Sequence, residues 1–183
     1  NALSLRDDCP DPTVADLFLI NGDYLNLKNA LVGSHSFPFR PVMLSTERLS
    51  AIAAGDNNSL PEWVQESGVA TLREAPDPAS LDAALDGAYL RHLLAMGQSL
   101  NNPLFFQCVQ ERVLARAIAV IWRAVRLGAG LRNHQQYFLP LGEHTLLLSD
   151  LLSASDTRAW PGIVGGELGE LLEHAMEFSE DEQ

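Results

Sequence analysis

Apolar residues recur at helical intervals along most of the chain, and this periodicity is the feature that most constrains its fold. Residues three or four positions apart share one face of an α-helix, whereas residues two positions apart share one face of a β-strand. Four long stretches show the helical spacing, and alternation of apolar and polar residues is sustained nowhere. The pattern therefore predicts an all-α protein.

The four long helices are expected over about residues 14–32, 78–99, 103–127 and 167–178. Pro78 and Pro103 stand at helix starts, where a missing N–H costs nothing, and Gly33, Gly97 and Gly128 mark helix ends. The stripe expected to face inward from the first helix comprises Leu17, Phe18, Tyr24, Leu27 and Leu31. The third helix is apolar on most of its sides, so we expect it to be the central, best-buried element.

Shorter helices are expected between the long ones. Ser45 can cap a short helix that carries Leu49 and Ile52 and ends at Gly55. A brief Trp63 turn follows, with Pro61 at its first helical position, and then a loop that contains Gly68 and Pro76. A second short helix carries Leu148, Leu151 and Leu152. We expect Trp63 and Trp160 to fill equivalent places in the core.

The order of these elements occurs twice. Long helix, glycine, Phe/Pro-containing turn, short Leu/Ser-rich helix and Trp turn extend over about 14–64 and again over about 107–164. An amphipathic helix follows each copy, and Leu, Leu and Ala coincide at Leu81, Leu85 and Ala88 and at Leu168, Leu172 and Ala175. The chain 1–183 is therefore predicted to be one helical domain with about two related repeats, about 14–100 and about 101–183, the second incomplete. Chance similarity in a chain rich in Leu and Ala is the alternative.

The net charge limits the classes of partner that this chain can bind, and its cysteine usage indicates the redox state of the thiols. Twelve Lys and Arg stand against 24 Asp and Glu, for a formal charge of −12, which disfavours nucleic acid and bare anionic membrane. The net negative charge is consistent either with a partner that has a basic protein surface or with a role in solubility alone. Cys9 and Cys108 lack a CxxC spacing and are expected to be reduced thiols. No apolar run is long enough to span a bilayer, and the start of the chain is too acidic for a signal peptide.

Local motifs of catalysis are missing from the sequence. It has no phosphate-binding loop, HExxH, EF-hand loop or GxSxG, so ATP hydrolysis by this chain is disfavoured. The five histidines, His35, His92, His134, His144 and His174, are scattered, and no catalytic residue, cofactor site or metal site is predicted. Of these, His92 could be a hydrogen-bonded core histidine. Asp82 and Asp86 form an i,i+4 pair near a helix start, where the helix dipole favours negative charge.

The segments that carry a family resemblance are Asp23-Tyr24-Leu25-Asn26-Leu27-Lys28-Asn29-Ala30-Leu31, Phe39 to Leu49, Leu81-Asp82-Ala83-Ala84-Leu85-Asp86-Gly87-Ala88-Tyr89-Leu90, Phe105 to Gly128, and Phe138-Leu139-Pro140-Leu141-Gly142 with Leu148 to Leu152. These segments resemble the C subunit of V-type (archaeal and bacterial A-type) ATP synthases, which corresponds to the d subunit of eukaryotic V-ATPases. Where the family's second long helix has Asn-Leu-Arg, this chain has Leu114-Ala115-Arg116. Family members are longer and contain three repeats. The two alternatives are that this chain is a fragment of such a protein or that it is a shortened homologue.

The resemblance implies a non-catalytic, funnel-like helical socket that couples the rotor shaft of a rotary ATPase to the membrane proteolipid ring during ion transport. Its expected partners are the central-stalk subunits and that ring, with no nucleic acid and no direct small-molecule substrate. The expected location is cytoplasmic, peripheral to the membrane through the complex. A free-standing helical adaptor or regulator is the alternative, and a helical enzyme whose site assembles from distant residues is a third. The sequence does not identify the interface residues.

Overall fold

The protein is all-α, as predicted. The computed structural model describes residues 2–40, 42–74, 77–126, 128, 131, 135–154 and 156–180, and no strand occurs among them. The long helices are α2 (Pro12–Leu31), α6 (Pro78–Ser99), α7 (Pro103–Arg126) and α11 (Gly166–Glu180). The shorter ones are α1 (Ala2–Asp7), α3 (Thr46–Ala53), α4 (Glu62–Gln65), α5 (Val69–Glu74), α8 (Gln135–Phe138), α9 (Thr145–Ser153) and α10 (Trp160–Val164). Single 3-10 turns are η1 (Asn57–Ser59), η3 (Gly142–His144) and η4 (Thr157–Ala159).

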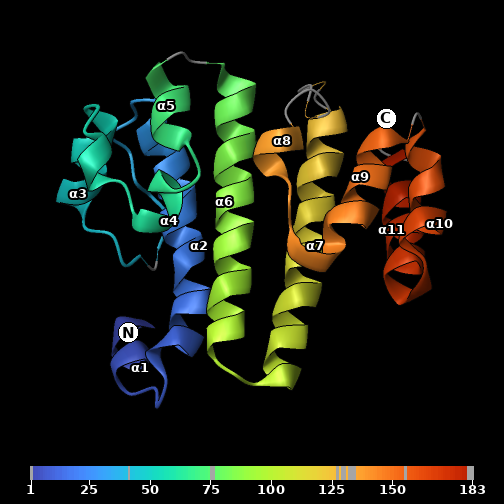
Figure 1. Ribbon diagram of the computed structural model, residues 1–183, viewed down its shortest axis with the longest axis horizontal. Helices are drawn as coiled ribbons and strands as arrows, with labels where there is room; N and C mark the ends of the chain where they lie inside the picture. The colour runs from blue at the N-terminus through green and yellow to red at the C-terminus, as the bar shows by residue number, and fades with distance from the viewer. Residues whose placement is uncertain are drawn as a thin grey trace.

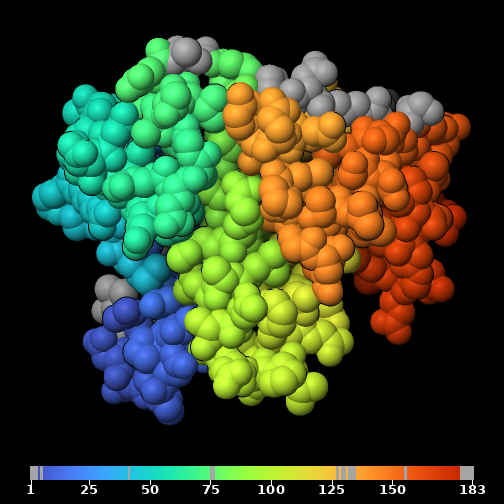
Figure 2. All heavy atoms as spheres, in the orientation of Figure 1, coloured from blue at the N-terminus to red at the C-terminus, as the bar shows by residue number. Residues whose placement is uncertain are grey.

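Three long helices form the body of the molecule. In Figure 1, α2, α6 and α7 lie side by side with α6 in the middle, and a short turn joins α6 to α7. Helices α3, α4 and α5 lie on the α2 side, whereas α9, α10 and α11 lie beyond α7, and the space-filling view shows the same order (Figure 2). Helix α6 contacts α2, α4, α5, α7 and α8. It is therefore the element around which the others pack.

Helix α6, and not α7, is the best-buried helix, so the sequence-based expectation was wrong on this point. The buried residues of α6 extend almost without interruption from Ser80 to Leu90, whereas those of α7 form one stripe, Val109, Val113, Ala117, Ile118 and Ile121. Helix α7 turns exposed residues such as Leu104 and Ala119 to solvent. Small residues on several sides of α6 let neighbouring helices approach from several directions.

Two glycines of α6 permit close approach. A Cβ at Gly87 would lie 2.6 Å from the carbonyl oxygen of Phe138 and 2.7 Å from that of Tyr137. A Cβ at Gly97 would lie 2.9 Å from a methyl carbon of Val109 on α7. These distances are shorter than van der Waals contact, so the end of α8 and the side of α7 can reach α6 only where a side chain is missing.

Pro78 and Pro103 begin α6 and α7 as predicted, whereas Gly97, which was expected to mark a helix end, lies inside α6. Asp11 and Asp77 are the N-caps of α2 and α6, and their carboxylates accept hydrogen bonds from the backbone N–H groups of Thr13 and Ala79. Ser45 caps α3 as expected. Gly33, with φ of +78°, follows the end of α2 in the left-handed conformation.

Several local expectations were wrong. The loop expected around Gly68 contains α5. Pro61 is the N-cap of α4 and not its first helical residue. Phe18 is 61% exposed, because the inward stripe of α2 contains Leu19 and Ile20 in its place. The sequence positions Pro76, Leu127, His134 and 181–183, which figured in the predictions, lie outside the described residues.

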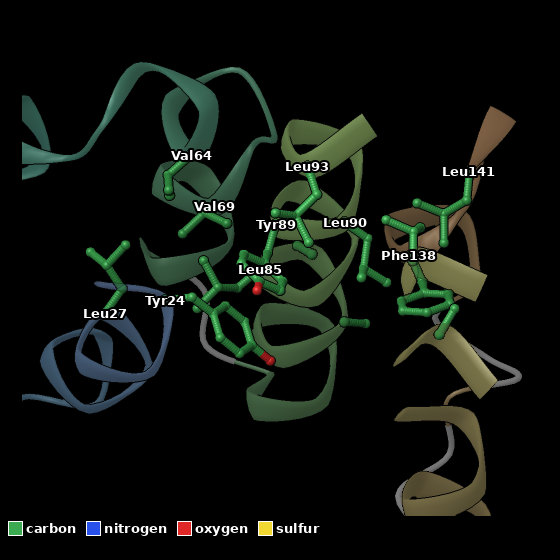
Figure 3. Close-up of a cluster of buried hydrophobic side chains, with 14 of the residues drawn as sticks. Tyr24, Leu27, Val64, Val69, Leu85, Tyr89, Leu90, Leu93, Phe138 and Leu141 are labelled. Carbon is green, nitrogen blue, oxygen red and sulfur yellow. The ribbon is translucent and has the colours of Figure 1, made fainter. Parts of the chain in front are cut away.

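The core lies on both sides of α6. Figure 3 shows Leu85, Tyr89, Leu90 and Leu93 of α6 between side chains of α2, α4 and α5 on one side and Phe138 and Leu141 on the other. Trp160 is fully buried, as expected, and packs edge-on against Trp122 of α7 at 5.6 Å between ring centroids. Trp63 is only half-buried, so the two tryptophans differ in their surroundings.

The order of elements after α2 reappears after α7. When α5 is left out of the first series and α8 and η3 out of the second, α2, α3, η1, α4 and α6 have the counterparts α7, α9, η4, α10 and α11. Leu49 and Ile52 of α3 are buried, as are Leu148 and Leu151 of α9. Asp56 before η1 and Asp156 before η4 cap their turns in the same way. Two structurally equivalent repeats remain a prediction, which superposition of α2 to α4 on α7 to α10 would test.

Candidate functional site: a buried charge cluster between three helices

Helix α2 directs polar side chains in two directions. Tyr24 and Lys28, one turn apart, face α6, whereas Asp23 and Asn26 face the segment that follows α2. The carboxylate of Asp23 accepts hydrogen bonds from the backbone N–H groups of Met43 and Leu44, at 3.0 and 2.9 Å. The Asn26 amide exchanges two hydrogen bonds with the backbone of Phe39, at 3.1 and 3.2 Å. These buried side chains fix the turn between α2 and α3.

Tyr24, Lys28, Asp82, Asp86 and Arg123 form a cluster, hereafter the Asp86 cluster, where α2, α6 and α7 meet. The ammonium group of Lys28 lies 2.6 Å from Oδ1 of both Asp82 and Asp86. The Tyr24 hydroxyl donates a hydrogen bond to Oδ1 of Asp86, and the Arg123 guanidinium lies 3.7 Å from its Oδ2. Asp86 is 1% exposed. One buried carboxylate thus has partners on both neighbouring helices.

Burial governs the protonation of this cluster. Desolvation raises the pKa of Asp86 above its ordinary value, because the low-dielectric interior disfavours the charged form, and the charge of Lys28 partly offsets this. Burial also raises the pKa of Tyr24, with the negative charge of Asp86 as the next cause. Tyr24 therefore stays a neutral hydrogen-bond donor, and Lys28 is the principal group that favours an ionised Asp86.

An aromatic and cationic layer adjoins the Asp86 cluster. The rings of Tyr24 and Tyr89 stack with centroids 4.2 Å apart (Figure 3). The Arg116 guanidinium of α7 lies 5.6 Å from the Tyr24 ring and 5.1 Å from the Tyr89 ring, and it donates a hydrogen bond to Asn21 at 2.6 Å. Contacts of a cation with aromatic faces are attractive at these distances. This layer adds a second connection between α2, α6 and α7.

The Asp86 cluster has the geometry of a structural clamp. The cavity beside Asp82, Asp86 and Arg123 holds about 70 Å³, enough for about two water molecules at ~30 Å³ each. Asp86 itself is buried, and its contacts join α2, α6 and α7. Lys28 and Asp82 of the cluster also line a second hollow, of about 170 Å³.

Side chains that could ligate a metal ion are dispersed. Within the described ranges, no three His, Cys, Asp or Glu side chains gather closely enough to hold a metal ion, and His134 lies outside those ranges. Cys9 and Cys108 are free thiols, half-buried and exposed respectively. None of the described helices is long and apolar enough to cross a membrane.

Two surface hollows differ in polarity. An apolar groove of about 280 Å³ lies between α7 and α11, hereafter the α7–α11 groove. Its lining comprises Ala115, Ile118, Ala119, Trp122, Leu168, Leu171, Leu172, Ala175 and Met176. A more polar pocket of about 450 Å³ lies between α4, α6 and α8, hereafter the α6 pocket. Each hollow is large enough to accept a side chain of another molecule or a small ligand.

The sequence indicated some members of these sites and misjudged others. Asp82 and Asp86 were expected to stabilise the start of a helix, but Asp77 has that place and Asp86 acts between helices. His92 is half-buried and stacks on Trp63, with ring centroids 5.3 Å apart. The signal that could have revealed the Asp86 cluster was the matching i,i+4 spacing of Tyr24 with Lys28 and of Asp82 with Asp86.

Segments 23–31 and 81–90 lie against each other in the Asp86 cluster, since the first contains Tyr24 and Lys28 and the second contains Asp82 and Asp86. Comparison of this chain with protein-family models, with curated proteins and with solved structures finds no match.

Proposed function

We propose that this protein is a non-catalytic central-stalk subunit of a V-type or A-type rotary ATPase, which couples the rotor shaft to the proteolipid ring. The observation that carries the proposal is the contact between the segments 23–31 and 81–90. Both segments resemble the same family, and they pack together through Tyr24, Lys28 and Asp86. This contact needs the polar residues of both segments. We therefore prefer a common family origin to a chance resemblance in each segment separately.

Each polar residue of the 23–28 segment has a specific partner. Asp23 and Asn26 hold the turn after α2, and Tyr24 and Lys28 hold α6. The order aspartate, aromatic, asparagine and lysine is therefore a set of contacts that shapes the fold. This supports the resemblance on physical grounds, because the pattern would be needed wherever this packing occurs.

A clamped helical body suits the transmission of torque. Charge pairs and aromatic contacts connect α2, α6 and α7 at the Asp86 cluster, and the core packs on both sides of α6. A densely packed interior has low compressibility and transmits strain. A coupling protein needs this stiffness together with surfaces for its partners, and it needs no reacting group.

The α7–α11 groove is the surface we assign to a partner. Its floor is apolar, and Leu171 at its edge is 65% exposed. The chain as a whole carries a formal charge of −12. A basic amphipathic helix of a stalk protein would bury apolar side chains in the groove, and the net negative charge of the chain would favour its approach.

Co-purification tests this function. The protein should retain the central-stalk subunits in a pull-down at low and at moderate salt, because salt slows the charged encounter but leaves a packed interface intact. The purified protein alone should not hydrolyse ATP. Failure to retain any stalk protein in either salt would leave the adaptor function, and robust ATP hydrolysis that persists through purification would overturn the non-catalytic role.

A further inference from the structure

The α6 pocket has a floor and two different walls. Ala88, Arg91, His92 and Ala95 of α6 form the floor. Trp63, Glu66 and Ser67 form one wall, and Gln136, Tyr137, Leu139 and Pro140 form the other. In Figure 2, atoms of α6 are visible between those of α4 and α5 and those of α8. The pocket thus lies where the first half of the chain meets the second.

Arg91 gives the pocket a positive group that backbone carbonyl groups hold in place. Its guanidinium donates a hydrogen bond to the carbonyl oxygen of Phe138 at 3.0 Å and a longer one to that of Tyr137 at 3.5 Å. Within the described part of the chain, no Asp or Glu forms an ion pair with it. Burial lowers the pKa of Arg91, with no acidic group among the causes. A guanidinium has five N–H donors in a planar fork, so donors remain for a bound anion.

Aromatic rings stand next to this cation. Trp63 and His92 stack nearly parallel, at an interplanar angle of 10°, and both are half-buried at the pocket. Tyr137 and Leu139 face them across the floor of the pocket. A flat apolar group could therefore replace water between the walls while an attached anion reaches Arg91.

The charge of the surroundings decides which anion fits. Glu66 lines the same pocket, and the whole chain carries a formal charge of −12. A phosphate or a nucleotide would bring about two or more negative charges into these negatively charged surroundings. A carboxylate brings only one, and its two oxygens can accept two hydrogen bonds from the planar guanidinium group. We propose that the α6 pocket binds a small planar monocarboxylate, with its carboxylate on Arg91 and its apolar ring between Trp63 and Tyr137.

Phenylacetate and phenylacetamide are the matched probes, because they differ in charge and hardly in shape. Phenylacetate should shift the NMR signals of Arg91, His92 and Gln136 and of the Trp63 indole in a saturable manner. Phenylacetamide and inorganic phosphate should each bind at least about tenfold more weakly, as expected when a charged hydrogen bond is lost. Equal binding of the amide, tighter binding of phosphate, or no shift with phenylacetate would each overturn the proposal.

Substitutions locate the site. Arg91→Gln should weaken phenylacetate binding about tenfold or more, and Glu66→Gln should strengthen it because a like charge is removed. Arg91 also supports the carbonyl groups at the end of α8, so Ala95→Trp provides a second variant that fills the pocket from an exposed position on α6. Thermal unfolding checks that each variant is folded. A folded Arg91→Gln or Ala95→Trp protein with unchanged affinity would contradict this assignment.

Discussion

Tyr24 of α2 donates its hydroxyl hydrogen to the carboxylate of Asp86 on α6, 62 positions later in the sequence. The two residues are 4% and 1% exposed, so this hydrogen bond forms where water does not compete. Lys28, one turn after Tyr24, contacts the same carboxylate oxygen at 2.6 Å. The packing of α2 on α6 is therefore specified by polar contacts as well as by apolar ones, and these contacts have consequences for stability.

Replacement of Lys28 by Met should destabilise the fold by about 3 kcal/mol at neutral pH, the lower end of the range for breaking a buried ion pair. Met keeps most of the aliphatic volume but removes the charge that lies 2.6 Å from Asp86. The lower end applies because Arg123 remains 3.7 Å from the carboxylate. Urea unfolding at constant ionic strength measures the loss.

Arg126→Met is the matched control, since Arg126 is an exposed cation at the end of α7. Its effect should stay within about 0.5 kcal/mol, as for most surface substitutions. The loss caused by Lys28→Met should also shrink at acidic pH, where Asp86 can take up a proton. Equal effects of the two substitutions at neutral pH would show that Lys28 does not compensate Asp86.

Asp86 should make the wild-type protein relatively more stable at acidic pH. Its pKa is raised in the folded state, so the folded protein binds this proton more tightly than the unfolded chain, whose aspartates titrate near 3.8. The stabilisation that comes from this bound proton is fully present below pH 3.8 and is lost as the pH rises through the higher pKa of Asp86 in the folded state. The stability difference between wild type and Asp86→Asn should therefore become less favourable to wild type from about pH 3.5 toward neutrality. If the wild-type protein instead gains stability relative to Asp86→Asn as the pH rises, the charge of Lys28 lowers the pKa of Asp86 by more than burial raises it.

Gly87→Ala should destabilise the protein by about 1–3 kcal/mol, the cost of an overpacked core position. The added methyl group would lie 2.6 Å from the carbonyl oxygen of Phe138 and 2.8 Å from the guanidinium of Arg91. Gly162 in α10 is the control, because a Cβ there meets nothing within 4 Å. Gly162→Ala should be neutral or up to about 1 kcal/mol stabilising. Helix propensity alone predicts that both substitutions stabilise, so thermal melts with opposite signs would separate close packing from propensity.

The helix positions were predictable because their signals are local. The helix expected over about 78–99 is α6 (Pro78–Ser99), although Gly97, expected to mark its end, lies inside it, and the helix expected over about 103–127 is α7 (Pro103–Arg126). Pro78 and Pro103 begin these helices whatever surrounds them. Which helix lies at the centre was not predictable, since that depends on the number of neighbours each face receives. Small residues such as Ala84 and Gly87 allow several neighbours but contribute little to an apolar pattern.

The polar site was harder to predict than the helices. Burial of Asp86 depends on α2 and α7 closing over it, and the i,i+4 pair with Asp82 was equally compatible with a solvent-exposed helix start. Arg91 and Trp63 are separated in sequence from Tyr137, and only the close approach at Gly87 brings α8 beside them. Such sites depend on contacts between distant elements, which periodicity does not encode.

Leu171→Ser should weaken the binding of central-stalk subunits about tenfold if the α7–α11 groove receives a partner helix, because burying a Leu side chain contributes about 1.5–3 kcal/mol and about 1.4 kcal/mol corresponds to a factor of ten. Leu171 is 65% exposed in the unbound protein, so the substitution should leave the thermal stability unchanged. Leu146→Ser is the matched control, since Leu146 is 79% exposed on α9 and is not part of the groove. Titration of each variant with the purified stalk proteins measures the change in Kd. Equal effects of the two substitutions would place the contact elsewhere on the protein, whereas a loss confined to Leu171→Ser would assign it to the groove.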